Sequence, residues 1–241
     1  DGVQMIDISD PTAIVAKDAE TDGATFTELG GALDVDTFTI GSKTYAIVVS
    51  QVDDGVQMID ISDPTAIVAK DAQDDGDSGG FDELDGVRDV ETFVIGSSTY
   101  AIAVSTVDDG VQILNITDPT TITATDAETD GVNSFTMLDQ ANGVSTFVID
   151  SSTYAIVASQ IDDGVQIIDI TDPTAIVAKD AETDGTNGFT ELNGASSVDT
   201  FVIGSSTYAI VVSNIDDGVQ MIDISDPTAI VALDAETDGV N

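Results

Sequence analysis

The sequence repeats itself about every 54 residues, and this periodicity limits the possible folds more than any other feature. Residues 1–16, 54–69 and 217–232 are identical. The tetrapeptide Asp-Gly-Val-Gln recurs at intervals of 53, 55, 54 and 54 residues, starting at Asp1, Asp54, Asp109, Asp163 and Asp217. A fixed period of this order is typical of architectures in which one supersecondary unit packs only against its neighbours. We therefore interpret the chain as a tandem array of one small module.

Each period contains four short apolar segments that we predict to be β-strands. They are rich in Val, Ile, Thr, Phe and Tyr, and in the first complete period they span residues 35–40, 44–50, 56–62 and 66–69. Three short connectors carry Gly, Asp and Pro at positions where tight turns need them: residues 41–43, 53–55 and 63–65. Three tight turns joining four strands predict an antiparallel meander.

Repeated four-stranded meanders predict an all-β fold, either a β-propeller or an open arc of blades. We treat residues 1–241 as a single repeat domain. It begins with a partial blade, residues 1–25, and ends with the start of a next loop, residues 235–241. Between them lie four full blades with their preceding loops, residues 26–71, 72–126, 127–180 and 181–234. The partial blade supplies only the third and fourth strands. We therefore expect the sequence to be a slice of a longer array, or its ends to pair with another copy.

The segment YAIVVSQVDDGVQMIDISDPTAIVA, which begins at Tyr45, resembles the LVIVD repeat of bacterial and archaeal surface proteins. In that family a strand near Tyr-Ala-x-Val-Ala is followed by Gly-Leu-x-Ile-Ile-Asp-Val-Ser-Asp-Pro. The resemblance covers all four periods and the partial one. It implies a β-propeller located at the cell surface or outside the cell.

The charge balance excludes several classes of function. The chain has 46 acidic and 5 basic residues, no His and no Cys, and a formal net charge of −41. Such a surface repels phosphate groups, so we expect no nucleic-acid partner. The apolar runs are too short to span a membrane, so we expect no membrane insertion. Without His and Cys there is no Ser-His-Asp triad and no thiolate or imidazole metal site.

The fourth segment of each period is followed by an acidic stretch that we interpret as a long loop able to bind calcium. Oxygen-bearing side chains at positions 1, 3 and 5, followed by Gly at position 6, resemble the start of an EF-like calcium loop. From Asp180, Glu191 occupies position 12. The predicted Ca²⁺ ligands are Asp18, Glu20, Asp22, Asp71, Gln73, Asp75, Asp126, Glu128, Asp130, Asp180, Glu182, Asp184, Glu191, Asp234, Glu236 and Asp238.

Two further repeated features have structural interpretations. Each long connector carries a Phe-x-x-Leu or equivalent pair, which we expect to pin the connector against a blade, at Phe26, Phe81, Phe135 and Phe189. The third segment carries an acid that we expect to accept hydrogen bonds from its surroundings, at Asp7, Asp60, Asp169 and Asp223. We assign no catalytic residue, because equivalent acids in every repeat give no reason for separated pKa values.

These observations predict a non-catalytic extracellular or cell-surface protein. In this interpretation it is a structural or adhesive scaffold with calcium-binding acidic loops. Its expected partner is either a further copy of itself, in a homopolymer, array or filament, or a surface ligand. The alternative is a multivalent, lectin-like glycan-binding propeller, although the chain lacks the Trp that often stacks on sugars. A calcium-dependent propeller hydrolase is a further possibility.

Overall fold

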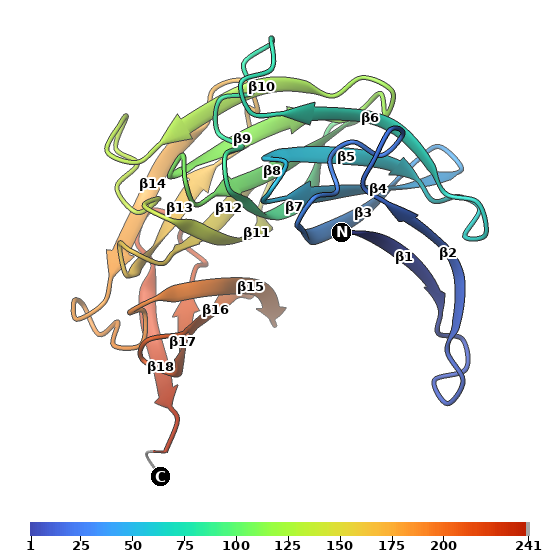
Figure 1. The fold of residues 1–241 in the computed structure, drawn as a ribbon. Helices are drawn as coiled ribbons and strands as arrows, with labels where there is room; N and C mark the ends of the chain where they lie inside the picture. The colour runs from blue at the N-terminus through green and yellow to red at the C-terminus, as the bar shows by residue number, and fades with distance from the viewer. Residues whose placement is uncertain (240–241) are drawn as a thin grey trace.

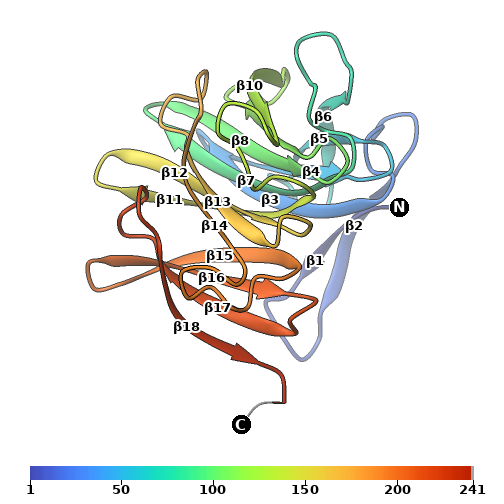
Figure 2. The ribbon, with the colours of Figure 1, turned by 90° about the vertical axis from the view of Figure 1, so that its left-hand side faces the viewer.

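A computed structural model describes residues 1–239, and within that range every regular element is a β-strand. The strands form antiparallel sheets that follow one another around an open arc (Figure 1). Seen from the side, successive sheets are turned relative to one another, so that each presents a face to the next (Figure 2). The predicted all-β fold, an arc of four-stranded antiparallel blades, is confirmed.

The described residues form one two-stranded sheet and four four-stranded sheets. We call the two-stranded sheet the half-blade; it contains β1 (Gly2–Asp7) and β2 (Val15–Thr21). The first blade contains β3 (Ala32–Ile40), β4 (Lys43–Ser50), β5 (Gly55–Asp60) and β6 (Val68–Asp74). The second contains β7 (Val87–Ile95), β8 (Ser98–Ser105), β9 (Gly110–Asn115) and β10 (Thr123–Thr129).

The third and fourth blades repeat this order. The third contains β11 (Ala141–Ile149), β12 (Ser152–Ser159), β13 (Gly164–Asp169) and β14 (Val177–Thr183). The fourth contains β15 (Ala195–Ile203), β16 (Ser206–Ser213), β17 (Gly218–Asp223) and β18 (Val231–Thr237). In every blade the first strand lies on the inside of the arc and the fourth on the outside (Figure 1).

The hydrophobic core lies between the blades rather than within them. We call the face toward the next blade along the chain the leading face, and the opposite one the trailing face. Phe38, Tyr45 and Ile47 on the leading face of the first blade pack against Val90 and Leu114 on the trailing face of the second. The next two junctions repeat this arrangement. Each blade is therefore stabilised mainly by its neighbours.

The long connectors contribute to these interblade cores as expected. Phe26, Phe81, Phe135 and Phe189 are all buried. A glutamine of the third strand fixes each connector: the Gln57 side-chain oxygen accepts a hydrogen bond from the Thr27 amide at 3.0 Å, and its nitrogen donates to the Asp71 carbonyl at 2.8 Å. The connector is thus held by one apolar and one polar anchor.

The outermost strand differs from the prediction. It was expected at residues 66–69, but β6 begins at Val68 and continues to Asp74, paired with β5 from Gln57↔Ala72 to Gly55↔Asp74. The start of the acidic stretch is therefore a strand and not a loop. Alanine and carboxylate residues disfavour strands, but a polar strand is tolerated at a sheet edge that faces solvent.

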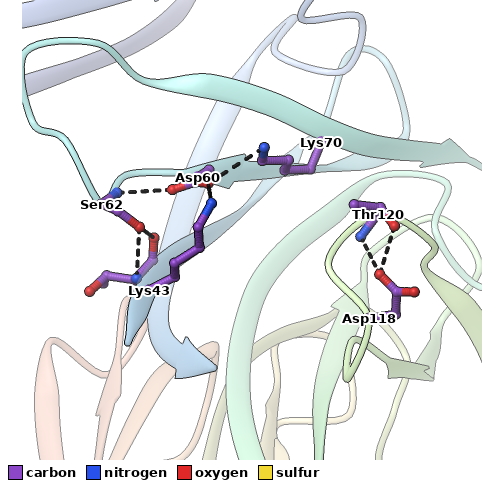
Figure 3. A network of polar contacts seen from close by, with 7 residues as sticks. Lys43, Asp60, Ser62, Lys70, Asp118 and Thr120 are labelled. Atoms are coloured by element: carbon purple, nitrogen blue, oxygen red, sulfur yellow. Dashed lines mark hydrogen bonds and ion pairs between the residues drawn. The ribbon is translucent and has the colours of Figure 1, made fainter. Parts of the chain in front are cut away.

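The third-strand acid accepts hydrogen bonds, as expected. Asp60 Oδ2 lies 2.8 Å from Lys43 Nζ and 3.4 Å from Lys70 Nζ, while Oδ1 accepts a hydrogen bond from the Ser62 amide at 3.1 Å (Figure 3). In the following Asp-Pro-Thr turns, as at Asp118 and Thr120, the Asp carboxylate accepts hydrogen bonds from the Thr amide and hydroxyl (Figure 3).

Within residues 1–239 there is no helix suited to crossing a membrane.

Candidate functional site

The inner strands carry carboxylates at two positions that differ between repeats. On β3 they are Asp34 and Asp36, and on β7 they are Asp89 and Glu91. The corresponding pairs are Gly143 and Ser145 on β11, and Ser197 and Asp199 on β15. All four strands contain Val, Thr, Phe and Ile at equivalent places, although their second position also varies: it is Leu33, Arg88, Asn142 or Ser196. The inside of the arc is therefore where the repeat symmetry is broken.

Hydrogen bonds connect these carboxylates to the next inner strand. Asp36 Oδ2 accepts hydrogen bonds from the Thr92 amide at 2.7 Å and the Thr92 hydroxyl at 2.6 Å. One pleat away, Asp34 Oδ2 accepts a hydrogen bond from the Val90 amide at 3.1 Å. These bonds leave Asp36 fixed in one orientation beside β7.

Glu91 lies in a desolvated and strongly negative setting. Burial raises its pKa to about 7, with further contributions from the charges of Asp36, Asp199 and Asp34. Asp199 belongs to β15, two blades beyond β7, so the carboxylates that raise this pKa come from the first and the fourth blades. A carboxyl group with this pKa is partly protonated at neutral pH and can donate a proton.

Asp89 is also shifted toward the protonated form. Burial raises its pKa to about 7, together with its neighbour Asp34, and the Val144 amide donates a hydrogen bond of 2.8 Å to Asp89 Oδ2. Asp199 differs, because its side chain is exposed while its Oδ1 accepts a hydrogen bond from the Thr200 amide at 2.8 Å. The site thus combines a buried, protonatable carboxyl group with an exposed one.

The third blade lies between the second and fourth blades, and its inner strand β11 contacts both β7 and β15. A Cβ atom at Gly143 would lie 2.8 Å from the Ser197 Cα, so glycine allows β11 and β15 to approach closely. Ser145 is buried, and its hydroxyl lies 3.1 Å from the Thr200 hydroxyl. Of the four inner strands, β3, β7 and β15 carry acids at these two positions, whereas β11 carries none.

Sequence reasoning missed these residues because it weighed the acids that recur in every repeat. A usable signal was present: Ser145 stands where the other inner strands have Asp36, Glu91 and Asp199, within a stretch that keeps Val, Thr, Phe and Ile constant. In a repeat protein, a position that varies among constant neighbours indicates a specialised role more directly than a recurrent acid. The influence of the first and fourth blades on Glu91 required the structure.

The structure spreads the predicted calcium ligands over separate contacts. The acids at position 1 of the motif form interblade hydrogen bonds, since Asp18, Asp71, Asp126 and Asp180 accept one each from the backbone amides of Ile67, Ile122, Ile176 and Ile230, at 2.6 to 2.8 Å. Position 1 is thereby committed to holding the next blade. Asp234, at the corresponding place, lies on β18 of the fourth blade.

Position 3 of the motif is occupied by Glu20, Gln73, Glu128, Glu182 and Glu236, all on outer strands. Glu128 and Glu182 accept hydrogen bonds from the side-chain nitrogens of Asn133 and Asn187, each at 2.9 and 3.1 Å. At position 5, Asp22, Asp75, Asp130 and Asp184 accept hydrogen bonds from the amides of Leu29, Leu84, Leu138 and Leu192; Asp238 lies just beyond β18.

Because positions 1 and 3 lie on an extended strand, their side chains do not converge as they would in a wrapped loop. Among residues 1–239 no group of three or more His, Cys, Asp or Glu side chains has an arrangement that could hold a metal ion. Calcium binding at the acidic motifs stays a prediction.

Glu191, the predicted ligand at position 12, lies in a narrow slot between its connector and the fourth blade. Its Oε2 is buried over Gly218 with no hydrogen-bond partner within the described part of the chain, and burial with the charges of Asp216 and Asp184 raises its pKa. Glu83 occupies the same slot of the second blade, where burial and Asp108 raise its pKa to about 8.

The third blade shows that this slot does not require a carboxylate. Met137 takes the place of Glu83 and Glu191, and its sulfur lies over Gly164 as the glutamate oxygens lie over the equivalent glycines. An apolar side chain and a carboxyl group with a raised pKa can share one environment when the carboxyl group is protonated. The slot is therefore part of the packing between connector and blade.

Comparison with known proteins identifies the architecture. No protein-family model matches the sequence, and the search of curated proteins gave no match. Among solved structures, the chain is similar to the periplasmic gluconolactonase of Pseudomonas aeruginosa (TM-score 0.68, 8% identity, 97% of this chain and 63% of that one). It is also similar to the exo-β-1,3-galactanase of Phanerochaete chrysosporium (0.57, 11%, 89% and 53%).

A third similar structure is the β-fructofuranosidase of Bombyx mori (TM-score 0.50, 12% identity, 89% of this chain and 52% of that one). The chain thus spans 52% to 63% of the length of these three proteins. At 8% to 12% identity the similarity establishes the fold, that of a β-propeller-like array.

The prediction of a non-catalytic scaffold, and of a protein that is not an enzyme, is corrected by these comparisons. These three similar structures are named as hydrolases and a lactonase. The physical reason for the error lies in the inner strands: the prediction assumed equivalent acids in every repeat, whereas β3, β7 and β15 carry acids where β11 has Gly143 and Ser145.

Proposed function

We propose that this chain carries the carboxylate site of a hydrolase that cleaves a glycosidic bond. The observation that carries the proposal is the position of Glu91, a half-buried carboxyl group on β7 next to Thr92, which fixes the Asp36 carboxylate by two hydrogen bonds. Burial and carboxylates from two other blades also raise the pKa of Glu91. Hydrolysis of a glycosidic bond requires one carboxyl group that donates a proton and a second that is ionised. The inner strands offer both kinds.

In this proposal Glu91 protonates the oxygen of the departing sugar or alcohol. Asp199, which is exposed, acts as the ionised partner that stabilises positive charge on the sugar ring or activates water. Asp36 is a positioning residue, since its carboxylate is held by the amide and hydroxyl of Thr92 and its charge favours the protonated form of Glu91.

The fold similarity supports a sugar-derived substrate. The exo-β-1,3-galactanase and the β-fructofuranosidase are named for cleavage of bonds between sugars, and the gluconolactonase for a sugar lactone. A lactone does not need a strong proton donor at its leaving group to the same degree as a glycoside. The protonatable Glu91 therefore favours the glycosidic bond as the target.

The test uses aryl glycosides that differ in their leaving groups. Replacing the general acid by Glu91→Gln is expected to lower kcat/KM about 10²- to 10⁴-fold for a poor leaving group such as methoxyphenol. Much less loss is expected for dinitrophenol, which departs without protonation. Asp199→Asn should lower the rate for both substrates, and Glu236→Gln on the outer strand β18 is the matched control.

Two results would contradict the proposal. One is the absence of hydrolysis above the buffer rate across α- and β-linked pentosides and hexosides. The other is a Glu91→Gln variant that folds like the wild type and shows the same loss for both leaving groups.

We also infer an extracellular or cell-surface location. The support is the net charge of −41 and the resemblance of the repeat to surface-protein sequences. Fractionation of cells that express the native gene, with the chain detected by antibody, tests this location.

A further inference from the structure

Arg88, on the inner strand β7, is the only arginine of the chain, and its partners differ from those of the lysines. All four lysines form ion pairs with aspartates; they are Lys17, Lys43, Lys70 and Lys179. Arg88 forms no ion pair within residues 1–239, although the chain has 46 acidic residues. Its positive charge is therefore not neutralised by a contact with a carboxylate.

Two uncharged side chains fix the guanidinium group of Arg88. Its Nη1 donates a hydrogen bond to Gln51 Oε1 at 3.1 Å, and its Nε donates to Asn142 Oδ1 at 3.2 Å. Gln51 follows β4 of the first blade and Asn142 belongs to β11 of the third, so the complete blades on both sides of β7 hold this side chain. Amide oxygens orient a guanidinium group without cancelling its charge.

Part of the guanidinium group is open to a ligand. A guanidinium group has five N–H donors, and the hydrogen bonds to Gln51 and Asn142 use two of them. Nη2 donates to no atom of the described residues. The buried side-chain atoms that lack a hydrogen bond belong to Glu83, Ser105 and Glu191, so Nη2 of Arg88 is in contact with solvent. Unused N–H groups in this planar arrangement fit the paired oxygens of an anion.

Arg88 occupies a β-bulge at the start of its strand. The pairing of β7 with β8 shifts its register between Val87 and Asp89. A bulge interrupts the alternation of side chains and redirects one of them. The other blades have the same shift, at Leu33, Asn142 and Ser196. The bulge is therefore constant among the blades, whereas the side chain that it carries is specific to each.

The bulge places Arg88 close to the candidate site along the same strand. Three residues at about 3.3 Å each separate it from Glu91, or about 10 Å, which is comparable to the length of a disaccharide. The acids of the inner strands, with Asp36 and Asp199 among them, repel a negatively charged ligand. A cation beside them reduces this repulsion for an anionic sugar, whereas a neutral sugar does not require one.

We propose that Arg88 determines specificity for a glycoside that carries an anionic group, a carboxylate or a sulfate ester, on a sugar unit beside the scissile bond. This inference rests on the proposed glycosidase function of Glu91. The unused N–H groups of Arg88 bind two oxygens of the anionic group, and Gln51 and Asn142 keep the guanidinium group in place.

The test compares three sugars that differ at one carbon: methyl glucoside, its 6-sulfate and methyl glucuronide. Each is used as the α and the β anomer, together with the galactose counterparts. Binding to the full 241-residue chain is measured by isothermal titration calorimetry. We expect at least one anionic sugar to bind at least about tenfold more tightly than its neutral counterpart, equivalent to about 1.4 kcal/mol. The two anionic series distinguish a carboxylate from a sulfate.

Variants assign this preference to Arg88. Arg88→Asn introduces the residue that the third blade has at the equivalent position, and it should reduce the preference for the anionic sugar at least about tenfold. Arg88→Lys keeps the charge but not the planar group, so part of the preference should remain. Lys179→Asn makes the same change in net charge on the outer strand β14 and should leave the preference unchanged. Circular dichroism melting curves show whether each variant is folded.

Equal binding of the anionic and neutral sugars by the wild-type chain would overturn the proposal. A folded Arg88→Asn variant that keeps the preference would also overturn it, because Arg88 would then serve only to connect the blades. Equilibrium binding does not require hydrolysis. A chain that prefers the anionic sugar but hydrolyses no glycoside would therefore contradict the function proposed for Glu91 and leave the role of Arg88 supported.

Discussion

The half-blade and the first blade contain the same sixteen residues in different surroundings. Residues 1–16 and 54–69 are identical, yet Ile6 is 45% exposed and Ile59 is 1% exposed. The difference comes from what packs against each strand, since β5 has β4 beside it and β1 has no such neighbour among the described residues. Strand formation is thus specified locally by the sequence, whereas burial is specified by the neighbouring repeats.

The largest expected contrast comes from truncating the same isoleucine in both copies. Ile59→Ala removes a fully packed side chain and should lower the free energy of unfolding by about 2 to 5 kcal/mol. Ile6→Ala removes an exposed side chain and should change it by less than about 0.5 kcal/mol. Urea unfolding followed by circular dichroism measures both. Equal losses would mean that the half-blade is as well packed as the first blade.

A smaller contrast is expected for the glutamine that anchors the connector. Gln57→Ala breaks the hydrogen bonds to the Thr27 amide and the Asp71 carbonyl, and leaves buried groups unpaired, which should cost about 1 to 3 kcal/mol. Gln4 occupies the same position of β1 but is exposed, so Gln4→Ala should be nearly neutral. Protease cleavage within residues 22–31 gives an independent readout, because only Gln57→Ala should release that connector.

The third-strand acids should differ in how they respond to pH. Burial alone would raise the pKa of Asp60, but hydrogen bonds from Lys43 and Ser62 outweigh it and hold the pKa below its usual value. A lowered pKa in the folded state contributes stability above about pH 4, and this contribution is lost as the pH falls further. Asp60→Asn should therefore reduce the acid sensitivity of unfolding.

The size of this effect is limited by the exposure of Lys43, so a loss below about 1 kcal/mol is expected at neutral pH. The pKa of Asp7 is lowered by the Ser9 amide and by Lys17. Its side chain is 35% exposed against 10% for Asp60, so Asp7→Asn should have less effect still. Thermal melts from pH 2 to 7 check the order of the two variants. A larger acid shift for Asp7→Asn would reverse the comparison.

Calcium is expected to give the smallest effect. In both regions the carboxylates at positions 1 and 5 already accept backbone hydrogen bonds: Asp18 and Asp22 in the half-blade repeat, Asp71 and Asp75 in the first blade. Bound calcium should raise the melting temperature relative to excess chelator at fixed ionic strength. Gln73 of the first blade stands at the repeat position that Glu20 occupies in the half-blade repeat. Gln73→Glu should therefore increase the calcium-dependent rise in melting temperature. Identical melting curves in both solutions would reject calcium binding.

The strand order and the interblade role of the connectors could be predicted from the sequence, because turn residues and apolar runs act locally. The predicted first and second strands match β3 and β4 to within three residues. The outer strand was misplaced, since its pairing with β5 overrides the poor strand propensity of Asp71 and Gln73. The influence of Asp36 and Asp199 on the pKa of Glu91 could not be predicted, because it depends on how far the arc turns between repeats.

At every junction an aspartate carboxylate accepts a hydrogen bond from a backbone amide of the next blade; these aspartates are Asp18, Asp71, Asp126 and Asp180. The angle between neighbouring blades is therefore set by contacts at their own junction and does not depend on the rest of the molecule. Insertion of one further copy of residues 54–108 should extend the arc at an unchanged radius. The gene could thus grow by whole-unit duplication without any residue having to be redesigned.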